Sequence, residues 1–158
     1  MRSVLELIEA IEEGALRYAA FAEVEAGVLR LRYAPGKWTG LQILAHVADS
    51  DMANYIRMVQ ALSVTGDELS NMPYAAEVIM DVLRCAERPA EISLAAIRGA
   101  RGLILHTLRA LPEESLRREL NHPQLGKVSA LWYAGIVADH GLHHVEQVEA
   151  IRDRSPGS

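Results

Sequence analysis

Asp139-His140-Gly141-Leu142-His143-His144 places three of the chain's six histidines within five residues. The stretch lies inside a segment, 129–152, whose apolar side chains recur at helical spacing. On a helix, His140 and His144 lie one turn apart on the same face, with Cβ atoms about 5–6 Å apart. A projection at about 100° per residue puts several apolar side chains on that face as well. The stretch therefore predicts a helix that turns a pair of imidazoles toward the protein interior.

Two interpretations of this pair stay open at the level of spacing. A buried imidazole must form hydrogen bonds or bind something, and two buried neighbours cannot both be protonated cheaply. A metal ion satisfies both demands, because neutral imidazole is a preferred metal ligand. In the alternative, the two side chains are core histidines satisfied by Gln147, a backbone carbonyl or water. A pair four residues apart also arises by chance, so the spacing alone does not decide.

A metal site would need a third ligand from another helix, since two histidines leave the ion under-coordinated. The candidates are His46, His106 and His122. His46 lies on a polar strip of the segment 39–62, which is either a solvent face or the wall of a polar cavity. His106 lies within an apolar pattern and His122 in a turn-rich stretch, which makes each a weaker candidate than His46.

Four long segments share the helical period, and no stretch shows the sustained alternation of β-strands. They cover residues 3–20, 39–62, 90–111 and 129–152. The second begins at Thr39-Gly40-Leu41-Gln42, which has the form of a capping box. Long connections rich in proline and glycine separate the segments. We therefore expect an all-α protein with the fold of an up-and-down four-helix bundle.

The chain length of 158 residues fits one domain, which we place at 1–154, with a flexible tail at 155–158. No run reaches the ~18 apolar residues of a membrane span, and the acidic N-terminal segment is unlike a signal peptide, so we expect a cytoplasmic protein. The net charge of −5 and the scattered basic residues argue against nucleic-acid binding. Arg98 and Arg101 are expected on a solvated helix face. The lone Cys85 is expected to be a small core residue.

Several motifs, taken in order, resemble those of the DinB/YfiT-like superfamily of small helical proteins. They are Pro35-Gly36-Lys37-Trp38-Thr39, His46-Val47-Ala48-Asp49, residues 126–129, and His140-Gly141-Leu142-His143-His144-Val145-Glu146-Gln147. The resemblance covers almost the whole chain, and the order and separation of the motifs make it specific. It implies a four-helix bundle, often dimeric, with a divalent metal held by one histidine of the second helix and two of the last. Carried onto this chain, the ligands are His46, His140 and His144, and the polar strip lines a cavity.

The resemblance also implies a chemistry. Characterised members of the superfamily resemble metal-dependent transferases or isomerases that use low-molecular-weight thiols such as bacillithiol, mycothiol or glutathione. We therefore expect a homodimeric transferase for a small-molecule substrate, with nickel, zinc, manganese or iron as the metal. A metal with an open position lowers the pKa of a bound thiol and presents it as a nucleophile.

Three further residues are expected to assist this site. Asp49, one turn after His46, is the candidate catalytic group, which would accept a hydrogen bond or position water. His143, displaced by about 60° from His140, and Gln147 are expected to orient groups near the metal rather than bind it.

Two other functions stay open. The same metal could activate water and make the protein a metal-dependent hydrolase. Alternatively, the chain is a non-catalytic helical module that dimerises or binds a partner, with its histidines merely packed.

Overall fold

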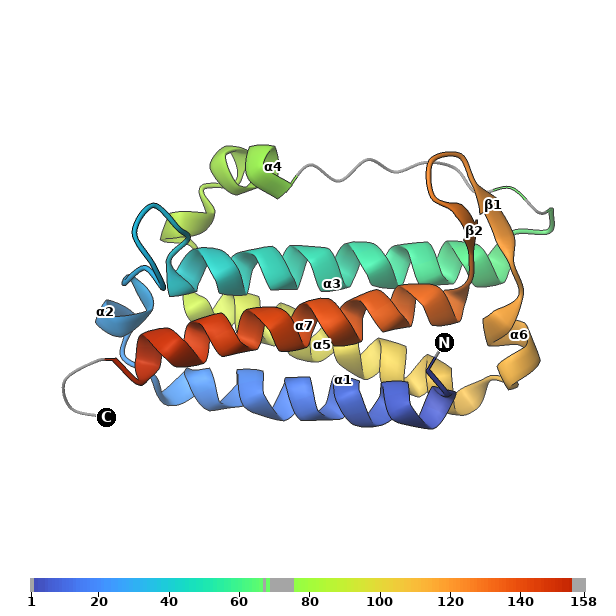
Figure 1. The fold of residues 1–158 in the computed structure, drawn as a ribbon, viewed down its shortest axis with the longest axis horizontal. Helices are drawn as coiled ribbons and strands as arrows, with labels where there is room; N and C mark the ends of the chain where they lie inside the picture. Colours follow the sequence, from blue (N-terminus) through green and yellow to red (C-terminus); the bar gives the residue numbers. More distant parts are fainter. Residues whose placement is uncertain (1, 67, 69–75, 155–158) are drawn as a thin grey trace.

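Four long helices form the frame of the protein (Figure 1). The computed structural model describes residues 2–66, 68 and 76–154. The four helices are α1 (Val4–Ala19), α3 (Gly40–Ser63), α5 (Ala90–Ala110) and α7 (Ala130–Arg152). The predicted all-α four-helix bundle is confirmed, and the tail predicted at 155–158 lies outside the described residues. No helix in the described part of the chain is both long and apolar enough to cross a membrane.

Three of these helices begin at side-chain caps. The Ser3 hydroxyl accepts a hydrogen bond from the backbone N–H of Glu6, and the Glu6 carboxylate accepts one from the backbone N–H of Ser3 at 2.7 Å. Thr39 and Gln42 form the same reciprocal pair at the start of α3, as the sequence predicts. Ser129 caps α7 by accepting a single backbone N–H. Caps of this kind stabilise a helix end by about 1 kcal/mol. Their residue types and spacing also make such helix starts predictable from the sequence.

The helix directions differ from simple up-and-down alternation. In Figure 1, α1 and α7 run in one direction, whereas α3 and α5 both run in the other. The packing agrees, because the early parts of α3 and α5 share one apolar cluster and their late parts share another. Each of α1 and α3 packs against both α5 and α7. The order is therefore up-down-down-up, and α5 begins at the same end of the bundle as α3.

The connections carry short elements. They are the 3-10 turn η1 (Ala20–Glu23), α2 (Ala26–Leu29), α4 (Ala76–Val82), the 3-10 turn η2 (Cys85–Glu87), α6 (Glu113–Arg117), β1 (Leu120–His122) and β2 (Gly126–Val128). The strands form an antiparallel hairpin with Leu120 opposite Val128. Gly126 adopts a φ of +75°, which favours glycine. The sequence does not predict this hairpin, because three-residue strands are too short to show alternation.

The core consists of two large apolar clusters separated by a polar layer. One cluster lies between the first half of α1, the second halves of α3 and α5, and the first half of α7. The other lies between the opposite halves of the same helices and also includes Phe21 and Leu29. At the boundary, α3 contributes the buried side chains of Ser50, Asp51 and Asn54. The layer is therefore enclosed by apolar packing at both ends.

A buried ion pair occupies this layer. The Nε of Arg101 on α5 donates to Oδ2 of Asp51 on α3 at 2.7 Å, and the two side chains are 1% and 0% exposed. The guanidinium also lies 4.8 Å from the centre of the Tyr18 ring on α1. The expectation of a solvated face is therefore wrong for Arg101, although Arg98 is exposed. The reason is that Asp51, 50 residues away in the sequence, compensates the buried charge.

The buried pair predicts a large effect of removing one partner. We expect Asp51→Ala to lower the free energy of unfolding by about 3–5 kcal/mol, because Arg101 would keep a buried charge without its partner. The matched control is Glu12→Ala, which breaks the exposed pair of Glu12 with Arg109 and should cost a small fraction of that. Urea unfolding followed by circular dichroism measures both. Equal losses would show that burial gives the Asp51 pair no special weight.

Candidate metal centre

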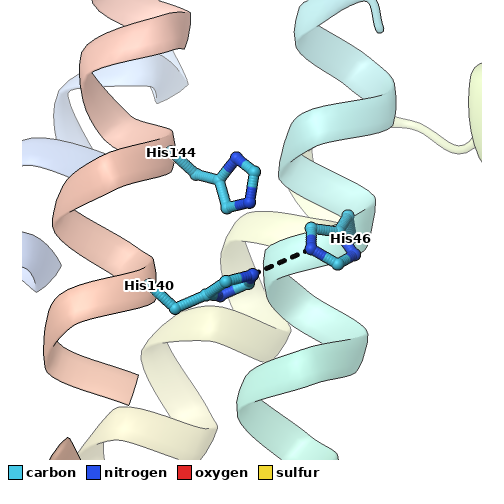
Figure 2. A group of neighbouring side chains, drawn as sticks. All are labelled: His46, His140 and His144. Carbon is cyan, nitrogen blue, oxygen red and sulfur yellow. Dashed lines mark hydrogen bonds between the residues drawn. The ribbon is translucent and has the colours of Figure 1, made fainter. Parts of the chain in front are cut away.

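Three histidines from two helices converge at one side of the bundle. His46 comes from α3, and His140 and His144 lie one turn apart on α7 (Figure 2). One ring nitrogen from each lies within 4.8 Å of the others. The Nε2 atoms of His46 and His140 are only 2.9 Å apart. The histidines that the resemblance assigns as ligands are therefore brought together in the structure.

The side of α3 that carries His46 is the wall of this cluster, not an open solvent face. His46 and Ser50 are buried, and Asp49 is half-buried. By contrast, Met52 and Val59, which are apolar, are 48% and 42% exposed. The polar strip is therefore packed against the cluster at these three positions rather than open to solvent. Composition alone could not decide, because on α3 the exposed positions are partly apolar.

The environment of the cluster keeps its imidazoles neutral. Burial, assisted by the neighbouring histidines, lowers the pKa of His46 to about 4 and that of His140 to about 3. Burial also lowers the pKa of His144. Neutral imidazoles present lone pairs, which is the form that binds a divalent metal. Three such donors within a few ångströms fit a divalent ion in both chemistry and number.

Gln147 orients two of the histidines. Its Oε1 lies 2.8 Å from Nδ1 of His144, and its Nε2 lies 3.1 Å from Nε2 of His143. Because an amide oxygen can only accept, the hydrogen of His144 lies on Nδ1, which leaves the lone pair on its Nε2. His143 and Gln147 thus lie beside the cluster, where the sequence analysis puts them, and His143 itself is exposed.

Trp38 covers the cluster from the loop before α3. The centre of its ring lies 4.9 Å from that of His46 and 6.3 Å from that of His144, with the latter two planes 25° apart. The indole therefore shields two imidazoles from solvent on one side. Helical periodicity could not reveal this role, because Trp38 lies outside the helix.

Asp49, the predicted catalytic group, lies near the cluster but is bound by an arginine. The Nη1 and Nη2 atoms of Arg88 donate to its two carboxylate oxygens at 2.8 and 3.0 Å. The Sγ atom of the buried Cys85 lies 4.0 Å from Oδ2. The role of Asp49 as a catalytic group stays a prediction, and the carboxylate is engaged on both oxygens. Sequence reasoning missed Arg88, which lies in an irregular segment far along the chain.

The other two candidate ligands lie away from this cluster. His106 is exposed on α5. His122 is buried in β1, where its Nδ1 accepts hydrogen bonds from the backbone N–H groups of Gln124 and Leu125 at 3.1 and 3.2 Å. Among the described residues, His46, His140 and His144 form the group whose nitrogen atoms lie close enough together to share a metal ion.

The lowered pKa values predict acid sensitivity of the metal-free protein. An unfolded histidine titrates near 6.5, whereas the pKa values of folded His46 and His140 are about 4 and about 3. Between these limits the unfolded chain binds protons that the folded chain does not. The free energy of unfolding should therefore fall as the pH falls, by up to about 1.4 kcal/mol per pH unit for each histidine.

Urea unfolding of chelator-treated protein between about pH 7 and about pH 4 measures this slope. We expect His140→Gln to make the slope of the free energy of unfolding against pH shallower by up to about 1.4 kcal/mol per pH unit, which is the contribution of one histidine. The control is His106→Gln, which changes an exposed histidine and should leave the slope unchanged. Equal slopes in His140→Gln and the wild type would contradict a neutral imidazole at His140, because this comparison cancels the contribution of other groups such as Asp51, whose pKa burial raises to about 6.

Comparisons with known proteins agree with this arrangement. Residues 6–148 match the sequence model of the DinB superfamily. A protein of Bacillus cereus (strain 03BB102), named as a candidate metal-dependent hydrolase, is 30% identical over 135 residues, which make up 85% of this chain and 76% of that protein.

Solved structures show the same fold. YfiT from Bacillus subtilis, described as a candidate metal-dependent hydrolase with an unusual four-helix bundle topology, aligns with a TM-score of 0.83 and 25% identity over 96% of this chain and 86% of its own. A mutant of the mycothiol-dependent maleylpyruvate isomerase aligns with a TM-score of 0.72 and 15% identity over 93% of this chain and 61% of that chain. The sequence match over most of the bundle and the identity to the Bacillus cereus protein show that this chain belongs to the DinB superfamily.

Proposed function

We propose that this protein is a divalent-metal enzyme with His46, His140 and His144 as the metal ligands. The observation that carries the proposal is the convergence of three neutral imidazoles within 4.8 Å. Zinc, nickel, manganese and iron all suit such ligands, and availability often decides among them. The metal-dependent names of the relatives support the dependence on a metal.

Each residue of the centre has a distinct part in this proposal. The three imidazoles hold the ion, Gln147 keeps His144 in the tautomer that binds, and Trp38 excludes water from one side. Three protein ligands are the number found in catalytic rather than structural zinc sites. When bound, the ion would supply Lewis acidity, which lowers the pKa of a thiol or a water molecule beside it.

We expect the wild-type protein to bind one divalent ion per chain. His46→Ala, His140→Ala and His144→Ala should each abolish tight binding, because two imidazoles under-coordinate the ion. His143→Ala should retain binding with lower affinity, since His143 contacts Gln147 and the ring of His144 but is not one of the three proposed ligands. Elemental analysis and calorimetric titration with Zn²⁺ and Ni²⁺ measure these changes.

The control for this series is His106→Ala, which removes an exposed histidine and should bind as the wild type does. A wild-type protein that takes up neither ion would refute the proposal. It would favour instead a non-catalytic helical module with packed histidines.

We propose thiol transfer as the reaction, with a low-molecular-weight thiol of the bacillithiol, mycothiol or glutathione type as co-substrate. The state of Asp49 favours it. Hydrolysis commonly uses a general base to assist water, and both oxygens of Asp49 are held by Arg88. A thiol needs no such base, because a metal deprotonates a coordinating thiol outright. The thiol proton would pass to solvent, and the thiolate sulfur would attack an electrophilic carbon of a small substrate. A carbon–sulfur bond would form as the bond from that carbon to its leaving group breaks and the leaving group departs with the electron pair.

Hydrolysis is the second candidate, supported by the names of the Bacillus relatives. Thiol dependence separates the two. With the metal-loaded protein and an electrophile such as 1-chloro-2,4-dinitrobenzene, we expect chloride release to require added thiol and to be lost in His140→Ala. Turnover of activated esters that is indifferent to thiol would instead establish hydrolysis. Asp49→Asn distinguishes them further, because it should impair hydrolysis by a base but spare thiol transfer.

A further inference from the structure

We infer that Arg101 is a positioning residue for the histidine cluster. Its guanidinium, anchored by Asp51, fills a notch at Gly141 and thereby sets the position of α7 against α3. The inference rests on the proposed function only in taking this cluster as the metal centre.

The notch consists of two glycines that face the same guanidinium. An ideal Cβ atom at Gly141 on α7 would lie 2.1 Å from Nη2 of Arg101, and one at Gly14 on α1 would lie 2.4 Å from Nη1. Both distances are too short for any side chain. The arginine head therefore occupies the space that side chains at these two positions would need.

The same arginine connects the two helices that carry the histidines. Its Nε donates to Asp51, which lies five residues after His46, about 7.5 Å along α3. Its Nη2 end lies against Gly141, which directly follows His140. One side chain from α5 thus contacts α3 near one proposed ligand and α7 beside another.

Tyr18 of α1 contacts the same point of α7. Its hydroxyl donates to the carbonyl oxygen of Gly141 at 2.9 Å, and its ring packs against the Arg101 guanidinium. Side chains of both α1 and α5 therefore contact the backbone next to His140.

Arg101 contacts α7 through close packing. Among the described residues, Nη1 and Nη2 of Arg101 have no hydrogen-bond partner, and neither does Nδ1 of His140. Since the guanidinium forms no hydrogen bond to α7 among the described residues, its fit against Gly141 fixes their separation. Metal–ligand distances lie within about 0.2 Å of their standard values, so a change in this fit that moves His140 should weaken metal binding.

The direct test is Gly141→Ala, which should displace the Arg101 head while leaving all three histidines in the sequence. We expect the affinity for Zn²⁺ to fall by about 10–100-fold, as it does when residues that orient metal ligands are changed. The matched control is Gly135→Ala on the same helix, where an ideal Cβ meets no atom within 4 Å. It should bind Zn²⁺ as the wild type does.

A second variant and a second control guard against loss of the fold. Arg101→Lys keeps a cation for Asp51 but cannot fill the notch, and it should weaken Zn²⁺ binding in the same way. Leu108→Ala removes a buried side chain of the distant apolar cluster. It should lower stability yet retain Zn²⁺ affinity, which separates positioning from a general loss of stability. Wild-type affinity in the folded Gly141 or Arg101 variant would overturn the inference.

Metal-free crystals keep the inference separate from the proposed function. If the wild type takes up no Zn²⁺, the proposed function fails, and the distance between Nε2 of His46 and Nε2 of His140 becomes the deciding measurement. We expect this distance to change beyond coordinate error in Gly141→Ala and to stay as in the wild type in Gly135→Ala. An unchanged distance in Gly141→Ala would overturn the positioning role.

Discussion

The ion pair of Arg101 with Asp51 is the constraint on which the rest of the bundle depends. A charge buried to this degree requires a partner, and the partner lies on a different helix. The guanidinium also requires the missing side chains of Gly14 and Gly141 and the face of Tyr18. The hydrophobic effect in the apolar clusters on either side is non-directional and does not by itself fix the register of one helix along another. The polar layer fixes this register, because a slide would press a Cβ into the arginine head.

The histidine cluster uses the same enclosed environment. Burial lowers the pKa values of His46 and His140 and so keeps lone pairs available at neutral pH. Trp38 deepens the burial, and Gln147 selects the tautomer of His144. Asp49, the acidic group near His46, forms an ion pair with Arg88, which compensates its charge. The local chemistry is therefore governed by nitrogen donors more than by carboxylates.

This balance bears on the reaction. Thiol transfer and hydrolysis both need a polarising ion at the three imidazoles, and they differ in which nucleophile is brought to it. The chain's own part in either reaction is to hold, orient and shield. An exogenous thiol suits a site whose nearest acid already has an arginine partner, whereas a hydrolase would have to release Asp49 from Arg88 or use another base.

The sequence by itself determined the features that depend on neighbouring residues. The capping box at Thr39 and the spacing of His140 and His144 act within one turn, so the start of α3 and half of the candidate site were predictable. The resemblance to a known family added His46. Only the tertiary structure decided the parallel course of α3 and α5, the burial of Arg101 and the capture of Asp49 by Arg88. Each of these joins residues tens of positions apart, and a charged side chain reads as a surface residue until its distant partner is in place.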